Sequence, residues 1–157
     1  MSLWYFAYGS NLRVTQIIER TGPLILMGDD RPQVARLPDY QLAFNMSDDG
    51  VEVFANVMPG EEGVWGVVYR LTEQALERMD RYERGYRRER VTVWVQNGPA
   101  IEVETYVALV ENLASGRSPS AAYLEKIVRG AGEHGLPTEY IEMIIQVAKG
   151  HPSSPSG

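Results

Sequence analysis

The sequence predicts an α+β protein in which helices are inserted between the strands of a curved mixed sheet or barrel and continue at the C-terminus. Short apolar segments recur along the chain, with the alternation or continuous burial that is typical of strands. Between and after them lie segments with helical spacing and capping residues at their starts. The expected strands are 3–8, 34–37, 40–44, 51–57, 64–69, 90–95 and 101–109, with a further apolar segment at 24–27.

The expected helices begin at recognisable start signals. Thr72 is a favourable N-cap, and Glu73 places an acidic side chain in the first turn of the helix that follows. Gly150 is a C-terminal stop for the last helix. Asn97-Gly98, between the last two strands, predicts a hairpin turn. The expected helices are 12–20, a segment from Thr72, one opened by Ser118 and Pro119, and one opened by Pro137 and Thr138.

Length and charge narrow the class of protein. The chain of 157 residues suits one domain, expected at 1–150, with a disordered tail at 151–157 that is rich in Pro, Ser and Gly. A net charge of −6 argues against nucleic acid as a partner. No apolar run approaches the roughly 20 residues that span a bilayer, which predicts no membrane contact. The N-terminus lacks the features of a signal peptide, so a cytoplasmic location is expected.

The absence of certain residue types limits the chemistry. The chain contains no cysteine, which excludes disulfides, thiol catalysis and thiolate metal sites. Its two histidines, His134 and His151, are too few and too far apart for a zinc site or a Ser-His-Asp triad. His134 lies in a glycine-flanked segment and is interpreted as a surface or packing residue. No metal ligand is therefore expected.

An apolar strand runs directly into a turn with the sequence Tyr8-Gly9-Ser10-Asn11-Leu12. Gly9 allows the backbone to bend where a side chain would clash. Ser10 or Asn11 is suited to cap the helix that follows. Free backbone N–H groups in such a turn favour an anion or a carbonyl oxygen. The alternative is that this turn only connects the strand to the helix and binds no ligand.

Glu83 is the second notable residue. The apolar stripe of the helix after Thr72, continued by one turn, reaches Tyr82 and Glu83 and so predicts a carboxylate on the core side. Burial would raise its pKa, which suits a general base. The alternative is that Glu83 lies in a frayed last turn and pairs with Arg87 or Arg88. Asp80 is a rival acid, expected to pair with Arg84.

Several segments together resemble the γ-glutamylcyclotransferase family, and the resemblance covers about residues 3–149. The matching segments, in the same order as in that family, are 6–12, 34–44, 64–69, 80–83, and 130–137 followed by Tyr140. The resemblance implies a small barrel fold and no cofactor. It also implies one acidic catalyst at Glu83. The implied substrate-binding residues are Tyr5, Phe6, Ala7, Tyr8, Gly9, Ser10, with Asn11 beside them, and Tyr123. The segment 84–88 is short and basic, and its Gly85-Tyr86 looks closer to the γ-glutamylamine and AIG2-like branches.

The implied activity is cleavage of a γ-glutamyl amide, a small-molecule substrate, by its own α-amine, which gives 5-oxoproline and a free amino acid or amine. A first alternative keeps this chemistry but changes the substrate to a γ-glutamylamine or another γ-glutamyl metabolite. A second, from a different class, is a non-catalytic barrel that binds a small anion or a partner. Glu83 favours the enzymes. The oligomeric state is left open, with a homodimer among the alternatives.

Overall fold

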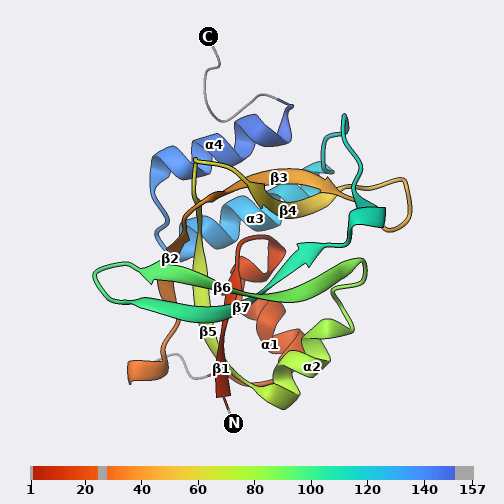
Figure 1. Ribbon diagram of the computed structural model, residues 1–157. Helices are drawn as coiled ribbons and strands as arrows, with labels where there is room; N and C mark the ends of the chain where they lie inside the picture. Colours follow the sequence, from red (N-terminus) through yellow and green to blue (C-terminus); the bar gives the residue numbers. More distant parts are fainter. Residues whose placement is uncertain (1, 25–27, 151–157) are drawn as a thin grey trace.

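The computed structural model describes residues 2–24 and 28–150, and its centre is a closed β-barrel (Figure 1). In the barrel, each strand pairs with the next and the last returns to the first. The barrel strands, in spatial order, are β1 (Ser2–Ala7), β5 (Val64–Thr72), β2 (Gln33–Leu37), β6 (Tyr86–Val95) and β7 (Ala100–Ala108). A separate two-stranded sheet consists of β3 (Tyr40–Met46) and β4 (Phe54–Pro59). The predicted α+β barrel is confirmed.

The strand directions bring three strand ends together at one end of the barrel. β1 runs parallel to β7, which it meets at the pair Tyr5↔Glu104, whereas β6 and β7 form an antiparallel hairpin. The C-terminal ends of β1 and β7 and the start of β6 therefore lie at the same end. The turn between β6 and β7 contains Asn97 with φ of 60°, as the Asn-Gly pair predicts.

The helices lie outside the barrel in two groups. α1 (Val14–Thr21) packs against α2 (Glu73–Asp80), whereas α3 (Ala121–Glu133) packs against α4 (Thr138–Ala148) (Figure 1). α3 also contacts a 3-10 turn, η1 (Ser10–Leu12), which follows β1. Two further 3-10 turns are η2 (Gly28–Asp30) and η3 (Val110–Asn112). None of the helices within residues 2–24 and 28–150 has the length and apolar character needed to cross a membrane.

Capping residues explain where α2 and α3 begin and where α4 ends. The Thr72 hydroxyl accepts a hydrogen bond from the Ala75 N–H at 3.0 Å, so the predicted N-cap of α2 is confirmed. Gly150 follows α4 with φ of 86°, the left-handed conformation that ends helices. Ser120, and not Ser118, caps α3: its Oγ accepts from the Tyr123 N–H at 3.1 Å.

Other element boundaries also differ from the sequence prediction. α1 begins at Val14 because residues 10–12 form the separate turn η1. β4 begins at Phe54 because the Asp49 carboxylate accepts from the backbone N–H groups of Val51 and Glu52, which holds that stretch in a turn. β6 begins at Tyr86, four residues before the expected start. Most of the apolar segment 24–27 and the tail 151–157 lie outside the described residues.

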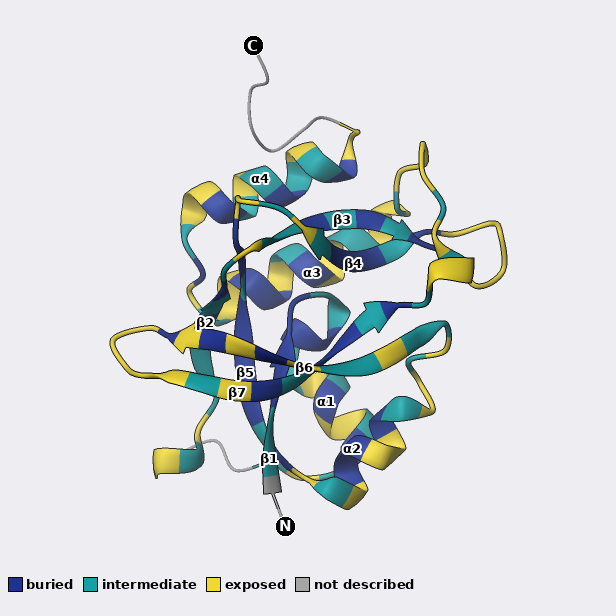
Figure 2. Cartoon of the chain, viewed as in Figure 1, coloured by how far each residue is buried: buried dark blue, intermediate teal, exposed yellow. Residues whose placement is uncertain are grey.

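The core fills the barrel and the space under the helices (Figure 2). β5 is almost continuously buried, as its nearly uniform apolar sequence predicts. Phe6 and Ala7 of β1 are fully buried, and Met79 of α2 is as well. This packing fixes the turn after β1 and the loop after α2, which together form the candidate site.

Candidate active site

The turn after β1 is tightly packed. A Cβ atom on Gly9 would lie 3.3 Å from Ala55 Cβ and 3.4 Å from Tyr123 Oη, which leaves little room for any side chain. The expectation that Ser10 or Asn11 caps the next helix is wrong. Arg13 occupies the N-cap position of α1 without a side-chain cap, and Ser10 Oγ instead accepts from Gln16 Nε2 at 2.7 Å. Ser10 and Asn11 begin η1, where backbone N–H groups have no acceptor within the helix.

Glu83 lies beyond the end of α2, in a turn that spans residues 81–85. The turn is held by hydrogen bonds from Tyr82 N to Met79 O and from Glu83 N to Asp80 O. The side chain of Glu83 is only 14% exposed, so its predicted burial is confirmed. The extended helical stripe was the wrong reason, because Tyr82 on the same stripe is 54% exposed.

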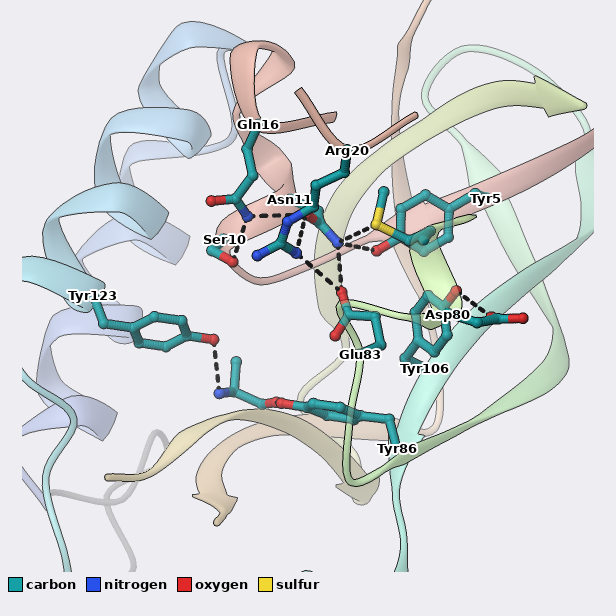
Figure 3. A network of polar contacts seen from close by, with 12 residues as sticks. Tyr5, Ser10, Asn11, Gln16, Arg20, Asp80, Glu83, Tyr86, Tyr106 and Tyr123 are labelled. Atoms are coloured by element: carbon teal, nitrogen blue, oxygen red, sulfur yellow. Dashed lines mark hydrogen bonds and ion pairs between the residues drawn. The ribbon is translucent and has the colours of Figure 1, made fainter. Parts of the chain in front are cut away.

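Asn11 holds the Glu83 carboxylate (Figure 3). Asn11 Nδ2 donates to Glu83 Oε1 at 2.7 Å and to the Tyr5 hydroxyl at 2.9 Å. Asn11 Oδ1 accepts from Gln16 Nε2 at 2.9 Å and from Arg20 Nη1 at 3.1 Å. Because Asn11 itself is only 3% exposed, this amide is a fixed part of the site.

Arg20 is the cation beside Glu83. Its Nη1 lies 3.6 Å from Glu83 Oε1, and its guanidinium lies 4.9 Å from the centre of the Tyr82 ring. Burial raises the pKa of the Glu83 carboxyl, and the Arg20 charge and the Asn11 hydrogen bond oppose that rise. A carboxyl with a raised pKa is suited to exchange protons near neutral pH.

The ion pairs that the sequence suggested for Glu83 and Asp80 are wrong. Arg87 pairs with Glu89, and Arg88 Nε lies 3.1 Å from Asp80 Oδ1, so neither arginine pairs with Glu83. Asp80, expected to pair with Arg84, also accepts a 2.6 Å hydrogen bond from the Tyr106 hydroxyl. Glu83 therefore remains the carboxylate that faces the turn after β1.

A small cavity lies between the turn after β1 and Glu83. Tyrosines form much of its wall, and their hydroxyls are held by partners: Tyr8 donates to Tyr106 O at 2.6 Å, and Tyr86 donates to Ala55 O at 2.6 Å. Burial raises the pKa of Tyr5, Tyr8 and Tyr86 well above the ordinary value, so these hydroxyls stay neutral. The lining residues are Tyr5, Tyr8, Gly9, Ser10, Asn11, Ala55, Glu83, Tyr86, Tyr106 and Tyr123.

A second, larger cavity adjoins the first on its outer side. The two cavities share Ser10, Glu83, Tyr86 and Tyr123, so Glu83 stands at their boundary. The outer cavity carries more charge than the inner one. Its charged lining residues are Arg20, Asp48, Glu83, Arg84 and Lys126.

Most of the site residues expected from the sequence meet at the inner cavity. Tyr5, Tyr8, Gly9, Ser10, Asn11, Glu83 and Tyr123 all line it. Phe6 and Ala7 do not: both are fully buried in the core, and they act by fixing the strand. Sequence reasoning missed Ala55, Tyr106 and Arg20. Tyr106 lies on the opposite face of β7 from Val103, so alternation along the strand marks it neither as buried nor as part of a site.

His134 lies apart from both cavities and supports the turn from behind. Its Nε2 lies 2.8 Å from Leu12 O and 2.9 Å from the Tyr69 hydroxyl, and the ring is half-buried. The interpretation as a packing residue is confirmed. Among residues 2–24 and 28–150, no group of three or more His, Asp or Glu side chains has the arrangement of a metal site.

Comparison with known proteins places the chain in a family. A model of the AIG2-like family matches residues 63–144, a stretch that contains Glu83 and Tyr123. The γ-glutamylcyclotransferase of Bos taurus is 35% identical over 88% of this chain and 75% of its own length. The human γ-glutamylcyclotransferase is 35% identical over 91% of this chain and 77% of its length. A solved γ-glutamyl cyclotransferase structure superimposes with a TM-score of 0.79 at 31% identity, covering 100% of this chain and 92% of that one.

The barrel and its buried carboxylate thus belong to an enzyme fold. The chain is a member of the γ-glutamylcyclotransferase family.

Proposed function

We propose that the protein converts γ-glutamyl amides to 5-oxoproline, with Glu83 as the group that moves protons. The observation that carries this proposal is the Glu83 carboxylate, which is held by Asn11 at 2.7 Å and lies at the boundary of the two cavities. A carboxylate in that position reaches substrate in the inner cavity and a leaving group in the outer one. The inner cavity is lined by both the turn after β1 and Glu83, which is where a glutamyl group folded toward a five-membered ring would have to lie.

The nucleophile in this reaction is the substrate's own α-amine. Glu83 accepts a proton from the α-ammonium, and the free amine attacks the γ-carbonyl carbon, forming the ring C–N bond. The tetrahedral intermediate then collapses, and the original amide C–N bond breaks as Glu83 returns the proton to the leaving nitrogen. The ring nitrogen still carries one proton more than the neutral lactam, and it loses this proton to the released amine. The carboxylate is restored, and the products are 5-oxoproline and a free amine or amino acid.

Two physical effects supply the rate in this mechanism. A well-oriented intramolecular attack is favoured by roughly 7–11 kcal/mol over attack by a separate amine, because the reactants are already joined, and the protein secures this orientation by holding the glutamyl chain folded. General acid–base catalysis by Glu83 adds roughly 10²–10⁴-fold. No nucleophilic side chain is required, which agrees with a chain that lacks cysteine.

The turn after β1 is proposed to anchor the substrate. Gly9 and Ser10 line the inner cavity, and backbone N–H groups at the start of a helical turn are suited to bind either the substrate α-carboxylate or the developing oxyanion. Tyr123, whose hydroxyl accepts from Ala55 N at 3.0 Å, closes the opposite wall. All these groups come from one chain, so the proposal does not require a homodimer.

Release of 5-oxoproline tests the proposal. The purified protein is incubated with γ-glutamyl-alanine, γ-glutamyl-ε-lysine and glutathione, and 5-oxoproline is measured by chromatography. Release from at least one substrate, abolished by Glu83→Gln, supports the enzyme. Binding of these compounds without any release would instead support the alternative, a barrel that binds small anions without catalysis.

A further inference from the structure

The outer cavity lies where the leaving group of the proposed reaction must go. If the glutamyl group fills the inner cavity, the amide nitrogen lies at the boundary, near Glu83, and its substituent extends past Tyr123 and Tyr86. Figure 3 shows Tyr123 and Glu83 on facing sides of this space, from α3 and from the loop after α2. The residues of the outer cavity therefore contact the part of the substrate that distinguishes one γ-glutamyl amide from another.

The charges of the outer cavity are unbalanced. Arg20 and Glu83 lie 3.6 Å apart and compensate each other. Arg84 and Lys126 form no ion pair within 4.0 Å among the described residues, and one acidic residue, Asp48, lines the same cavity. Two cations against one carboxylate leave an excess positive charge. This excess occurs in a protein whose net charge is −6.

The two unpaired cations approach the boundary from different elements. Arg84 follows Glu83 directly in the loop after α2. Lys126 is three residues after Tyr123 on α3, so the two side chains share one face of that helix. Both cations are exposed, which lets them reach a ligand without a desolvation cost of their own. An anionic group on the substituent of the amide nitrogen would lie between them.

We propose that Lys126 and Arg84 are specificity-determining residues that select substrates whose leaving group carries a carboxylate. This inference rests on the proposed function and concerns the same site. A leaving amino acid bears its carboxylate on the carbon bound to the amide nitrogen, within reach of the outer cavity. Leaving amines without a carboxylate lose this attraction, and leaving groups with a second amine are repelled.

A matched pair of substrates isolates the carboxylate. γ-Glutamyl-alanine and γ-glutamyl-ethylamide differ only in the carboxylate of the leaving group, and the measurement is the ratio of their kcat/KM values. We expect a ratio above one in the unaltered protein. Lys126→Met and Arg84→Met should each lower it about threefold, and the double variant about tenfold, as partly screened charge pairs predict. Added salt should raise KM for γ-glutamyl-alanine and leave that for the ethylamide level.

Charge reversal gives a second readout. Lys126→Glu should improve the kcat/KM for γ-glutamyl-(2-aminoethyl)amide relative to γ-glutamyl-alanine, because the new carboxylate attracts the leaving group's second amine. The matched controls are Arg129→Met, on the same helix and paired with Glu125 at 3.3 Å, and Arg81→Met in the same loop. Neither residue lines the inner or the outer cavity, so neither variant should change the ratio.

The outcomes separate this inference from the proposed function. If 5-oxoproline forms but the ratio is the same in the unaltered protein and in the Lys126 and Arg84 variants, the selectivity is overturned and the activity stands. If the controls lower the ratio as much as the two variants do, the effect is the overall charge and the assignment is overturned. If no substrate yields 5-oxoproline, the proposed function fails and the inference falls with it.

Discussion

Asn11 Nδ2 lies 2.7 Å from Glu83 Oε1 and connects the turn after β1 with the loop after α2. The same amide donates to Tyr5 and accepts from Gln16 and Arg20, so both of its ends are occupied. Such an amide cannot rotate without losing hydrogen bonds on both sides. The position of the carboxylate is therefore set by the protein before any substrate enters.

Glu83→Gln should reduce kcat by roughly 10²–10⁴-fold, because an amide of the same shape cannot move a proton at neutral pH. Substrate binding, measured by calorimetry, should be largely kept. Glu77→Gln is the control, since Glu77 is an exposed carboxylate of α2 that lines neither cavity. A Glu83→Gln protein that retains more than about a tenth of the rate would remove Glu83 from this role.

The same substitution should not lower stability at neutral pH. The pKa of Glu83 is raised in the folded protein, so between its ordinary and its raised value the folded state binds more protons than the unfolded state. Ionisation of Glu83 therefore costs stability as the pH rises through that interval, and glutamine removes this cost. Thermal unfolding at pH 7 should give a Tm for Glu83→Gln equal to or above that of the unaltered protein. A clearly lower Tm would show that the ion pair with Arg20 outweighs the cost of burial.

Asn11→Leu should impair both catalysis and stability. Loss of the amide leaves the Tyr5 hydroxyl without its hydrogen-bond donor and leaves Glu83 with Arg20 alone, and an unsatisfied buried polar group costs about 1–3 kcal/mol. Displacement of the carboxylate should lower kcat by up to about 10²-fold. Denaturant unfolding and steady-state kinetics measure the two effects. Normal kcat in a folded Asn11→Leu protein would contradict the positioning role.

Arg20→Met should shift the pH dependence of kcat/KM. The Arg20 charge holds the pKa of Glu83 lower than burial alone would, so its removal should raise that pKa further. The ascending limb of the profile then moves to higher pH, and Arg20→Lys should restore part of the original position. The neighbouring Asp80 raises the pKa of Glu83 and is unchanged in both variants. If the ascending limb does not move, it reports ionisation of the substrate's α-ammonium and not of Glu83.

Gly130→Ala and Gly132→Ala should have opposite effects, although both glycines lie in α3. A Cβ on Gly130 would lie 2.7 Å from Leu12 Cβ and 2.9 Å from Leu12 C, so it would push η1 out of place. We expect lower activity and a lower Tm. A Cβ on Gly132 meets no atom within 4 Å, and alanine there should gain up to about 1 kcal/mol from helix propensity. Equal activity in both variants would show that the site tolerates movement of η1.

The sequence predicted the fold class and most residues of the site, because these depend on local patterns and on a family resemblance. The burial of Glu83 was predicted from the apolar stripe of α2, but the helix ends at Asp80, and the burial comes from packing of the turn that follows it. The ion-pair partner of Glu83 was not predicted, since Arg20 lies 63 positions earlier in the chain and meets Glu83 only after α1 packs against α2. Local spacing favoured Arg87 and Arg88 instead, but β6 begins at Tyr86 and carries both of them away from the cavity.

Tyr106 shows a second limit to predicting the site from the sequence. Alternation puts it on the same face of β7 as Glu102 and Glu104, so the strand pattern does not predict that it is only 4% exposed. Its place in the site depends on the parallel contact Tyr5↔Glu104, which puts Tyr106 beside Tyr5 with ring centres 5.7 Å apart. Register between strands a hundred residues apart depends on the closed barrel as a whole, which no single segment specifies.

The pairing of β1 has a consequence for biosynthesis. β1 is made first, yet its antiparallel partner reaches from Val67 to Thr72 and its parallel contact is Glu104. While the chain is still on the ribosome, the apolar residues of β1 have no strand to pair with, and such exposed segments are prone to aggregate. The turn at residues 8–11 reaches its final geometry only after Tyr123 has been synthesised and α3 has packed against it. A nascent chain released before that point would contain the turn after β1 but would lack Tyr123 and α3, which enclose the site.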